Sequence, residues 1–406
     1  MTSPAVIRLG VIGLGAVAQS VHLPLLRRRP ELFAITAISD ISPSLLASVG
    51  EVFGIVHSAR YTDAFALLDR DDLDAILICS GGSHEPIVTA ALERDLAVLC
   101  EKPLAFTHAE LDRLRQVAPM EGPPRLMVGY MKQYDPATAL ARQLLNDIDD
   151  VRTVDVRVLH PTGQSQLDFA HLISSGGDIP DDTRDELRRT DRALWDSAFG
   201  EGDENEDLWR VYAGCLMSSL SHDMAVVRTL FAPITAVDFA DIWRTSSRHQ
   251  RRQTGRDAGG LGAQPPSIRA VGAIEETTRF TLDWHYLHDY PAYRETIKII
   301  YGAGSLELAF PSPYLLHAPT VLTQYSAAGE AEARTEFRNI GESFEIQLEA
   351  FADMIHQEMQ PLTDLVGAEH DVDTSQAIVA SYAERMGIPL GGELDSEPSR
   401  ARGVTA

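Results

Sequence analysis

Two short motifs place residues capable of chemistry at the ends of apolar runs. Gly-Leu-Gly-Ala-Val-Ala at residues 13–18 directly follows the apolar run from Val6 to Ile12, and Glu101-Lys102-Pro103 follows a later apolar run. The first motif is typical of the strand–turn–helix unit that binds a dinucleotide. The second places a Glu-Lys pair at the end of an expected parallel strand, where open α/β sheets bind ligands. A dinucleotide beside a positioned lysine indicates an oxidoreductase.

Each small residue of the glycine motif has an expected role. Gly13 permits a tight turn, Gly15 lets the backbone approach a pyrophosphate, and Ala18 stands where close helix–strand packing needs a small side chain. Ala16 and Val17 open the following helix, whose N-terminal amides would bind the pyrophosphate. The alternative is a plain structural turn, because glycines also serve ordinary turns.

Asp40 bears on the choice of cofactor. It follows the second apolar run, at the position where an acidic residue holds the ribose 2′-hydroxyl of a dinucleotide. A carboxylate there repels a 2′-phosphate, and no arginine follows it in Ile41-Ser42-Pro43. The sequence therefore favours NAD over NADP. The alternative is an aspartate that caps a helix.

The first third of the chain alternates strand and helix patterns with short links. Runs suited to strands buried on both faces are Val6–Ile12, Phe33–Ser39, Ala75–Ser80, Ala97–Cys100 and Leu126–Tyr130. Helical stretches begin at Ser42-Pro43 and at Thr62 or Asp63, and cover Glu85–Arg94 and Thr107–Val117. This alternation predicts an α/β domain, a Rossmann-type doubly wound parallel sheet over residues 1–132.

Beyond residue 132 the pattern changes. Strands are expected at Val151–Leu159, Ala236–Trp243, Glu276–Tyr286, Glu295–Tyr301 and Ser305–Phe310, the last two joined as a hairpin by Gly302-Ala303-Gly304. Helices are expected at Leu208–Phe231, Glu342–Met359 and Thr374–Met386. Residues 133–406 are therefore predicted to form an α+β domain on a largely antiparallel open sheet.

Composition excludes several classes of protein. The net charge of −24 argues against a nucleic-acid partner, and no run approaches the ~18 apolar residues of a membrane span. Three cysteines without CxxC spacing indicate neither a disulfide framework nor a metal site. Together with the absence of a signal pattern, this predicts a cytoplasmic enzyme.

Charge is also distributed unevenly along the chain. Residues 178–207 hold twelve acidic residues and four arginines, and residues 244–256 hold five arginines and His249. Both stretches are polar and contain glycine, so we expect solvated loops. The alternative is that the basic stretch docks against an acidic stretch of another subunit.

The chain resembles the Gfo/Idh/MocA oxidoreductases, the family of glucose–fructose oxidoreductase and inositol 2-dehydrogenase. The residues that carry the resemblance are Gly13–Ala18, His22-Leu23-Pro24, Asp40, His84, Glu101-Lys102-Pro103, Gly129–Pro136 and His222. The resemblance implies a Rossmann domain and a second domain whose open sheet serves as a subunit interface, hence a homodimer or homotetramer. It also implies that Ser80, His84 and Glu101 contact the cofactor, and that the substrate is a small molecule such as a sugar, glycoside or cyclitol.

The resemblance assigns the catalytic roles to Lys102 and His222. Lys102 would lie beside the nicotinamide and stabilise alkoxide character on the hydroxyl being oxidised. His222 would face it across the cleft and accept the proton, since histidine titrates close to neutral pH. The alternatives are a surface salt bridge for the lysine and a structural role for the histidine.

One position departs from the family pattern. Inositol-dehydrogenase-like members carry an aspartate four residues before this histidine, and here that residue is Ser218. A serine can hydrogen-bond a substrate hydroxyl but cannot support a histidinium as a carboxylate does. Asp223 is expected to point about a quarter-turn away from His222 and to act as a structural cap.

Further substrate contacts are expected from three residues. Met131 and Lys132 match family positions that contact the polyol, and His160 ends a strand that could face the cleft. Strand alternation sends Trp284 and Tyr286 to one face and His285 to the other. These aromatic residues suit either a sugar ring or a subunit interface, and the sequence leaves that choice open.

The sequence thus predicts an NAD-dependent oxidoreductase acting on a secondary hydroxyl or ketone of a cyclic polyol. Two alternatives stay open. One is a redox-neutral, NAD-dependent enzyme that oxidises a sugar transiently to cleave a glycosidic bond. The other is a non-catalytic regulator that binds nucleotide.

Overall fold

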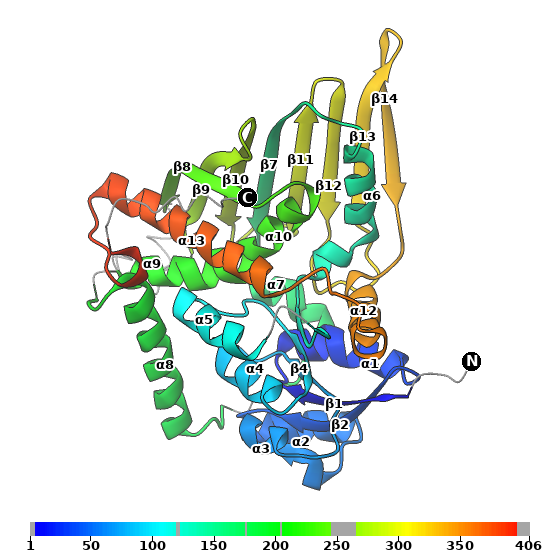
Figure 1. The fold of residues 1–406 in the computed structure, drawn as a ribbon, viewed down its shortest axis with the longest axis vertical. Coiled ribbons are helices and arrows are strands. Elements are labelled where there is room, and N and C mark those ends of the chain that lie inside the picture. The colour runs from blue at the N-terminus through cyan, green and yellow to red at the C-terminus, as the bar shows by residue number, and fades with distance from the viewer. Residues whose placement is uncertain (1–4, 119–121, 175–176, 204, 245–264, 396–406) are drawn as a thin grey trace.

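The protein is built on two β-sheets joined by helices (Figure 1). The computed structural model describes residues 5–118, 122–174, 177–203, 205–244 and 265–395. One sheet has six parallel strands and the other has eight strands that are mostly antiparallel. The predicted fold class, a Rossmann-type sheet followed by an α+β region, is confirmed.

The first sheet has the strand order β3-β2-β1-β4-β5-β6, with every neighbouring pair parallel. Its strands are β1 (Ile7–Ile12), β2 (Phe33–Ser39), β3 (Arg60–Tyr61), β4 (Ala75–Ile78), β5 (Ala97–Cys100) and β6 (Leu126–Val128). Its helices are α1 (Leu23–Arg28), preceded by a π-helical turn η1 (Ala18–His22), α2 (Pro43–Val52), α3 (Ala64–Leu68), α4 (Glu85–Leu92) and α5 (His108–Val117). The order changes direction at β1, so the carboxyl ends of β1 and β4 flank a ligand-binding crevice.

Local capping explains where these helices begin. Ser42 caps α2 by accepting a hydrogen bond from the amide of Leu45, and Asp63 caps α3. Thr107 and Glu110 form a capping box at the start of α5. Each cap satisfies amides that the first helical turn leaves without partners.

The second sheet has the order β14-β13-β12-β11-β7-β10-β9-β8. Its strands are β7 (Val151–His160), β8 (Ile234–Trp243), β9 (Ser267–Ile274), β10 (Thr278–Tyr286), β11 (Arg294–Tyr301), β12 (Gly304–Phe310), β13 (Val321–Ala328) and β14 (Ala331–Arg338). Only the β7–β10 pair is parallel among these neighbours. The predicted hairpin is confirmed, because Tyr301 of β11 pairs with Gly304 of β12.

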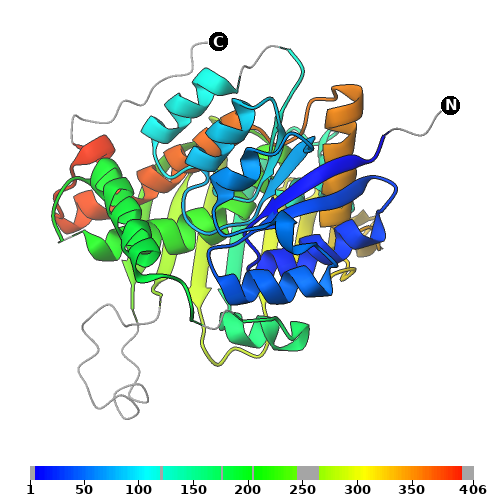
Figure 2. The ribbon, with the colours of Figure 1, turned by 90° about the horizontal axis from the view of Figure 1, so that it is seen from below.

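Helices pack on one face of the second sheet (Figure 1). The helices that follow residue 132 are α6 (Pro136–Leu145), α7 (Gly163–Leu167), α8 (Asp181–Phe199), α9 (Glu206–Val211), α10 (Ser221–Leu230), α12 (Ser343–Gln357) and α13 (Leu365–Met386), with a π-helical stretch η5 (Tyr212–Leu220) between α9 and α10. Figure 2 shows the same elements from below. α13 and α10 pack on β8, and α6 packs on β12 and β13. The expected helix at Leu208–Phe231 is therefore present as the α9–η5–α10 rod.

The expectation of a solvated loop over the acidic stretch is wrong, because residues 181–199 form α8. Charge pairs one turn apart support this helix, including Arg184 with Asp181 at 3.2 Å and Arg192 with Asp196 at 2.8 Å. Its last turn buries Trp195 and Phe199. The helix thus combines a charged surface with an apolar C-terminal end that is buried against neighbouring elements such as α9.

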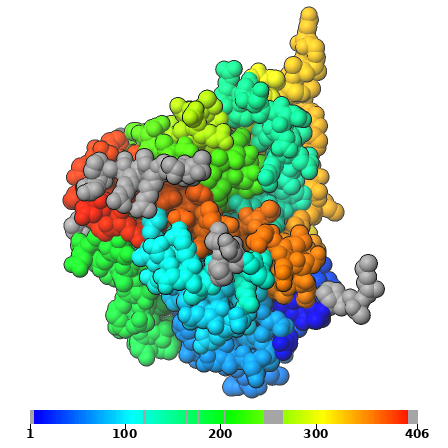
Figure 3. Space-filling model, viewed as in Figure 1, coloured from blue at the N-terminus to red at the C-terminus, as the bar shows by residue number. Residues whose placement is uncertain are grey.

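Some elements of the structure were not predicted from the sequence, and one prediction concerns residues that the structure mostly does not describe. The sequence patterns did not predict α6, β9, β13 or β14, and Figure 3 shows the β13–β14 hairpin projecting from the body. Most of the basic stretch lies outside the described residues, except Arg244, which lies 3.5 Å from Asp207 of the same chain. Among the described helices, none combines the length and apolar character needed to cross a bilayer.

Candidate active site

The glycine turn after β1 requires glycine at Gly13 for two reasons. Its φ is +87°, and a Cβ there would lie 2.4 Å from the backbone nitrogen of Ser80. Gly15 differs, because a Cβ built on it meets no atom within 4 Å. The turn therefore needs Gly13 for its own packing, whereas Gly15 leaves open space next to the start of the following helix.

Asp40 bridges the glycine turn and the link to α2. Its Oδ2 accepts from the amide of Leu14 and its Oδ1 from the amide of Ser42, both at 2.8 Å. The alternative role, capping of α2, belongs to Ser42 instead. The carboxylate keeps further lone pairs for a ribose hydroxyl, since an ionised carboxylate accepts about four hydrogen bonds.

The residues around this turn fit NAD by their own chemistry. Just after β4 and beside the turn, the hydroxyl oxygen of Ser80 is buried and finds no hydrogen-bond partner among the residues that the structure describes. The space next to Gly15 adjoins the helix that starts at Ala16, whose N-terminal amides suit an anion. This hydroxyl, the open space next to Gly15 and the Asp40 carboxylate thus surround the glycine turn.

Glu101 is held in place by a buried histidine. Its Oε1 lies 2.8 Å from Nε2 of His22, and both side chains are buried. Burial raises the pKa of Glu101, but the contacts with His22 and Lys102 together outweigh it, so the net pKa is lowered and the carboxylate stays charged. Gly129 packs on this residue, because a Cβ there would lie 3.0 Å from Cα of Glu101.

Lys102 follows β5 in the first region of the chain, residues 1–132, and reaches across to the second region, residues 133–406. Its Nζ donates a hydrogen bond to the carbonyl oxygen of Ser218 at 2.6 Å. Burial lowers the pKa of Lys102, Glu101 raises it and Lys132 lowers it, with a net decrease. The lysine is therefore a positioned donor in a partly dehydrated setting.

His84 fixes the turn that carries Lys102. Its Nδ1 lies 2.7 Å from the carbonyl oxygen of Pro103, and its Nε2 lies 2.6 Å from the carbonyl oxygen of Ser80. Burial lowers the pKa of His84, although both carbonyls favour its protonated form. With both ring nitrogens facing the backbone, this side chain ties the Lys102–Pro103 turn to the crevice.

His222 lies on α10, directly after the π-helical stretch η5. Its Nδ1 is buried and has no hydrogen-bond partner within the described part of the chain. Burial, Lys102 and Lys132, in that order, lower the pKa of His222 well below 6.5. The histidine is thus a neutral base near two lysines, which is the state a proton acceptor needs.

Ser218 and Asp223 flank His222 in different ways. Ser218 presents its carbonyl to Lys102, and its hydroxyl donates to the carbonyl of Gly214. Asp223 does not act as the expected cap, since the N-terminus of α10 has no side-chain cap. It is buried instead beside Glu295, and burial followed by the Glu295 charge raises the pKa of Asp223 well above 3.8.

Lys132 pairs with a residue that sequence reasoning missed. Its Nζ contacts Glu295 of β11, and both side chains are buried. The hydroxyl of Tyr293 donates to the other oxygen of Glu295, and Nζ also lies 5.1 Å from the ring centre of Phe310. The only available sequence signal was the alternation of β11, which sends Glu295 to the same face as Ile297.

His160 ends β7 inside an aromatic group. Its ring centre lies 5.7 Å from those of Trp284 and Tyr293 and 6.3 Å from that of Tyr286. Burial lowers the pKa of His160. The predicted alternation is confirmed, because Trp284 donates to Ser219 Oγ on the helical side while His285 contacts Ser267.

The structure therefore brings together most of the predicted site residues. Lys102 donates to the Ser218 carbonyl, and the charges of Lys102 and Lys132 both act on His222. Met131 is buried next to Lys132 in the turn η3 (Met131–Tyr134). His160 joins this group through Tyr293 and Glu295.

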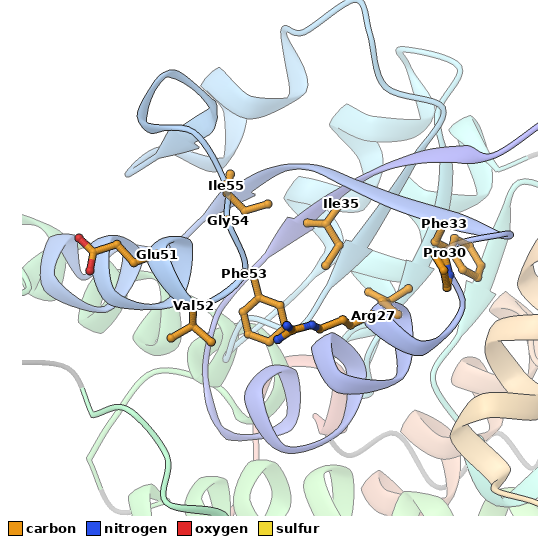
Figure 4. Close-up of a pocket in the computed structure, with 10 residues that line it drawn as sticks. Arg27, Pro30, Phe33, Ile35, Glu51, Val52, Phe53, Gly54 and Ile55 are labelled. Atoms are coloured by element: carbon orange, nitrogen blue, oxygen red, sulfur yellow. The ribbon is translucent and has the colours of Figure 1, made fainter.

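A surface hollow on the first region lies away from this group (Figure 4). It is lined by the end of α1, the start of β2 and the end of α2, including Arg27, Phe33 and Phe53. Ligands of parallel sheets bind at the carboxyl ends of the strands, and Phe33 begins β2 whereas Asp40 follows its end. The hollow is therefore separate from the candidate site.

The parallel sheet, the glycine turn and Asp40 define a Rossmann-type dinucleotide-binding protein. Residues 7–130 match the Gfo/Idh/MocA model, described as an oxidoreductase family with an NAD-binding Rossmann fold. This match confirms, for residues 7–130, the resemblance drawn from the motifs of the chain.

Curated relatives match part of the chain. An inositol 2-dehydrogenase/D-chiro-inositol 3-dehydrogenase of Shouchella clausii is 31% identical over 160 residues, 39% of this chain and 46% of that protein. An inositol 2-dehydrogenase of Pseudomonas fluorescens is 36% identical over 131 residues, 32% of this chain and 38% of that protein. The chain thus matches less than half the length of these relatives.

Solved structures extend the similarity of fold over nearly the whole chain. A scyllo-inositol dehydrogenase from Lactobacillus casei with bound NAD(H) and scyllo-inositol has a TM-score of 0.63 at 16% identity, covering 94% of this chain and 98% of the other. An aldose-aldose oxidoreductase from Caulobacter crescentus has a TM-score of 0.66 at 19% identity, covering 94% and 98%. At this identity the likeness establishes the fold of both regions.

Proposed function

We propose that this protein is an NAD-dependent dehydrogenase or reductase that acts on a secondary hydroxyl or ketone of a cyclic polyol. The observation that carries the proposal is the convergence of Lys102 and His222 beside the dinucleotide crevice. Lys102 follows β5 at the ligand-binding edge of the parallel sheet, and its Nζ reaches Ser218, one helical turn before His222. A donor and a neutral base thus meet where an alcohol can lie.

Bound NAD would supply the hydride acceptor. The groups that would hold it are Gly15 and the amides of Ala16 and Val17 for the pyrophosphate, and Asp40 for the ribose. Ser80 offers an unpartnered hydroxyl at the same edge.

The chain's own residues perform the proton chemistry in this proposal. Lys102 donates a hydrogen bond to the substrate oxygen and stabilises the negative charge that develops there. His222, neutral because its pKa is lowered, accepts the hydroxyl proton. Glu101 and His84 hold the lysine turn through the contacts given above.

In this proposal Lys132, Met131 and His160 contact the substrate. The charge of Lys132 is balanced by Glu295, so it can orient a hydroxyl without an unpaired charge in a buried setting. The aromatic group around His160 offers apolar ring faces, which suit the apolar face of a sugar or inositol ring. The inositol dehydrogenases among the relatives support this substrate class.

We also propose the division of labour between the two regions. Residues 1–132 would bind the cofactor, and residues 133–406 would bind the substrate and form a homodimer or homotetramer through the open sheet. The face of β10 that carries Asp283 and His285 points away from the helices, and Asp283 pairs there with Arg269 at 2.6 Å. Light scattering on the purified protein would test the assembly.

The experiment that tests the proposed activity follows NADH absorbance while the protein is given NAD and a panel of inositols, free sugars and glucosides. We expect NADH to form with one group of substrates. Release of an aglycone from a glucoside without net NADH would favour the redox-neutral cleaving enzyme. NAD binding without any turnover would favour a regulator.

A further inference from the structure

The link between β7 and α8 docks on the dinucleotide-binding turn. The side chain of Gln19 lies between the turn and this link. Its Nε2 donates to the carbonyl oxygens of Leu14 and Ile173 at 2.7 and 3.0 Å, and its Oε1 accepts from the amide of Ile173 at 2.9 Å. A segment of the second region is thereby fixed directly over the first.

A second contact of the same link lies at the start of α2. Oδ1 of Asp178 accepts from the hydroxyl of Ser42 at 2.6 Å, and its Oδ2 accepts from the amide of Ser44 at 2.7 Å. Figure 1 shows the start of α8, just after this residue, beside α2 and α3. The hydrogen bonds from Ser42 and Ser44 lower the pKa of Asp178, so the carboxylate is charged at neutral pH.

Two carboxylates therefore flank Ser42. Asp40 accepts from its backbone amide at 2.8 Å, while Asp178 accepts from its hydroxyl. Asp40 stands at the position that holds the adenosine ribose in this fold. Asp178, which comes from the other region of the chain, thus lies next to the ribose position.

The groups that Asp178 occupies are those that a 2′-phosphate would need. A phosphate at this position is bound by hydroxyls and by amides at a helix N-terminus, and Ser42 and Ser44 offer one of each. With the carboxylate in place, these donors are used and the local charge is more negative. NADP would have to displace Asp178 and face its charge, whereas NAD would not.

We propose that Asp178 is a specificity-determining residue that, with Asp40, excludes the 2′-phosphate of NADP. This inference rests on the proposed binding of NAD at the glycine turn. It assigns to the second region a part in choosing the cofactor. If Asp178 instead only held the two regions together as a latch, its removal would lower the stability of the protein without changing the preference for NAD over NADP.

The test uses the full-length protein and its D178N and D178A variants, with D182N as the matched control. Asp182 is an exposed acidic residue at the start of α8 whose carboxylate accepts from the amide of Thr183. NAD and NADP are titrated separately by isothermal calorimetry, and the ratio of the two dissociation constants, NADP over NAD, is compared. The thermal midpoint without cofactor reports any latch effect.

We expect this ratio to fall by about tenfold or more in D178A and by less in D178N, which retains a neutral acceptor. D182N should leave it unchanged. A ratio that stays constant in both Asp178 variants while NAD still binds would overturn the inference and leave a latch. If the wild-type protein binds neither cofactor, the proposed NAD site itself fails, and the inference fails with it.

Discussion

The Nζ atom of Lys102 lies 2.6 Å from the carbonyl oxygen of Ser218, a residue 116 positions later in the chain. This hydrogen bond joins the end of β5 to the π-helical stretch η5, and π-helical stretches commonly occur at functional sites. It brings the lysine to the helix that carries His222. The candidate site is therefore assembled by both regions of the chain.

The two glycines of the turn should respond differently to alanine. Gly15→Ala adds a methyl group into open space, so the free protein should keep its stability while NAD binds at least about tenfold more weakly. Gly13→Ala should lose about 1–3 kcal/mol of unfolding free energy, because φ is positive and the methyl group meets Ser80. Urea unfolding and calorimetric titration check both results. Unchanged NAD affinity in Gly15→Ala would show that the pyrophosphate does not bind at this turn.

His222→Ala should reduce kcat by about 10²–10⁴ if this histidine accepts the substrate proton. Because its pKa lies well below 6.5, the wild-type kcat/KM should stay level from pH 8 to pH 6.5 and fall only at lower pH. The variant should lack this acid limb. A wild-type limb centred above pH 6.5, or the same limb in the variant, would point to another base.

Much of the fold could be predicted because its signals are local. The apolar run before Gly13 and the caps Ser42 and Thr107 lie within a few residues of the elements they define. α8 was missed because its surface charges look like a solvated loop until Trp195 and Phe199 are seen to pack. β14 was missed because its side chains are mostly exposed at the edge of the sheet.

Ser218→Asp should restore a carboxylate one helical turn before His222. A nearby negative charge favours the imidazolium, so the pKa of His222 should rise by about one unit or more. The acid limb of kcat/KM should move to higher pH by the same amount. Ser218→Asn is the control, because it adds similar bulk without charge. An equal shift in both variants, or none in either, would show that position 218 does not act electrostatically on His222.

Glu295→Gln should destabilise the protein by about 3–5 kcal/mol, because Lys132 would remain buried without its anionic partner. Unfolding in urea measures this change. The double variant Lys132→Met/Glu295→Gln should recover part of the loss, since the unpaired charge is then gone. If the single variant is as stable as the wild type, the two side chains are not a buried ion pair in solution.

The site was predictable only where one motif carries the chemistry. The expectation for Lys102 rests on such a motif, Glu101-Lys102-Pro103, whereas the expectation for His222 rests on the family resemblance. Glu295 lies 163 residues from its partner Lys132, and no local pattern links them. Asp178 likewise comes from an acidic stretch that has no motif, and only the folded chain places it at α2.

The comparison of wild-type protein with Lys102→Ala tests the central claim most directly. Both proteins are first shown by calorimetry to bind NAD, and NADH formation is then followed with the polyol that the panel identifies. We predict that the variant binds NAD as the wild type does but loses about 10²-fold or more in kcat. Lys298→Ala, a lysine on β11, serves as the control and should keep its turnover. Near-native NADH formation by Lys102→Ala would contradict the assignment of this lysine and the site built around it.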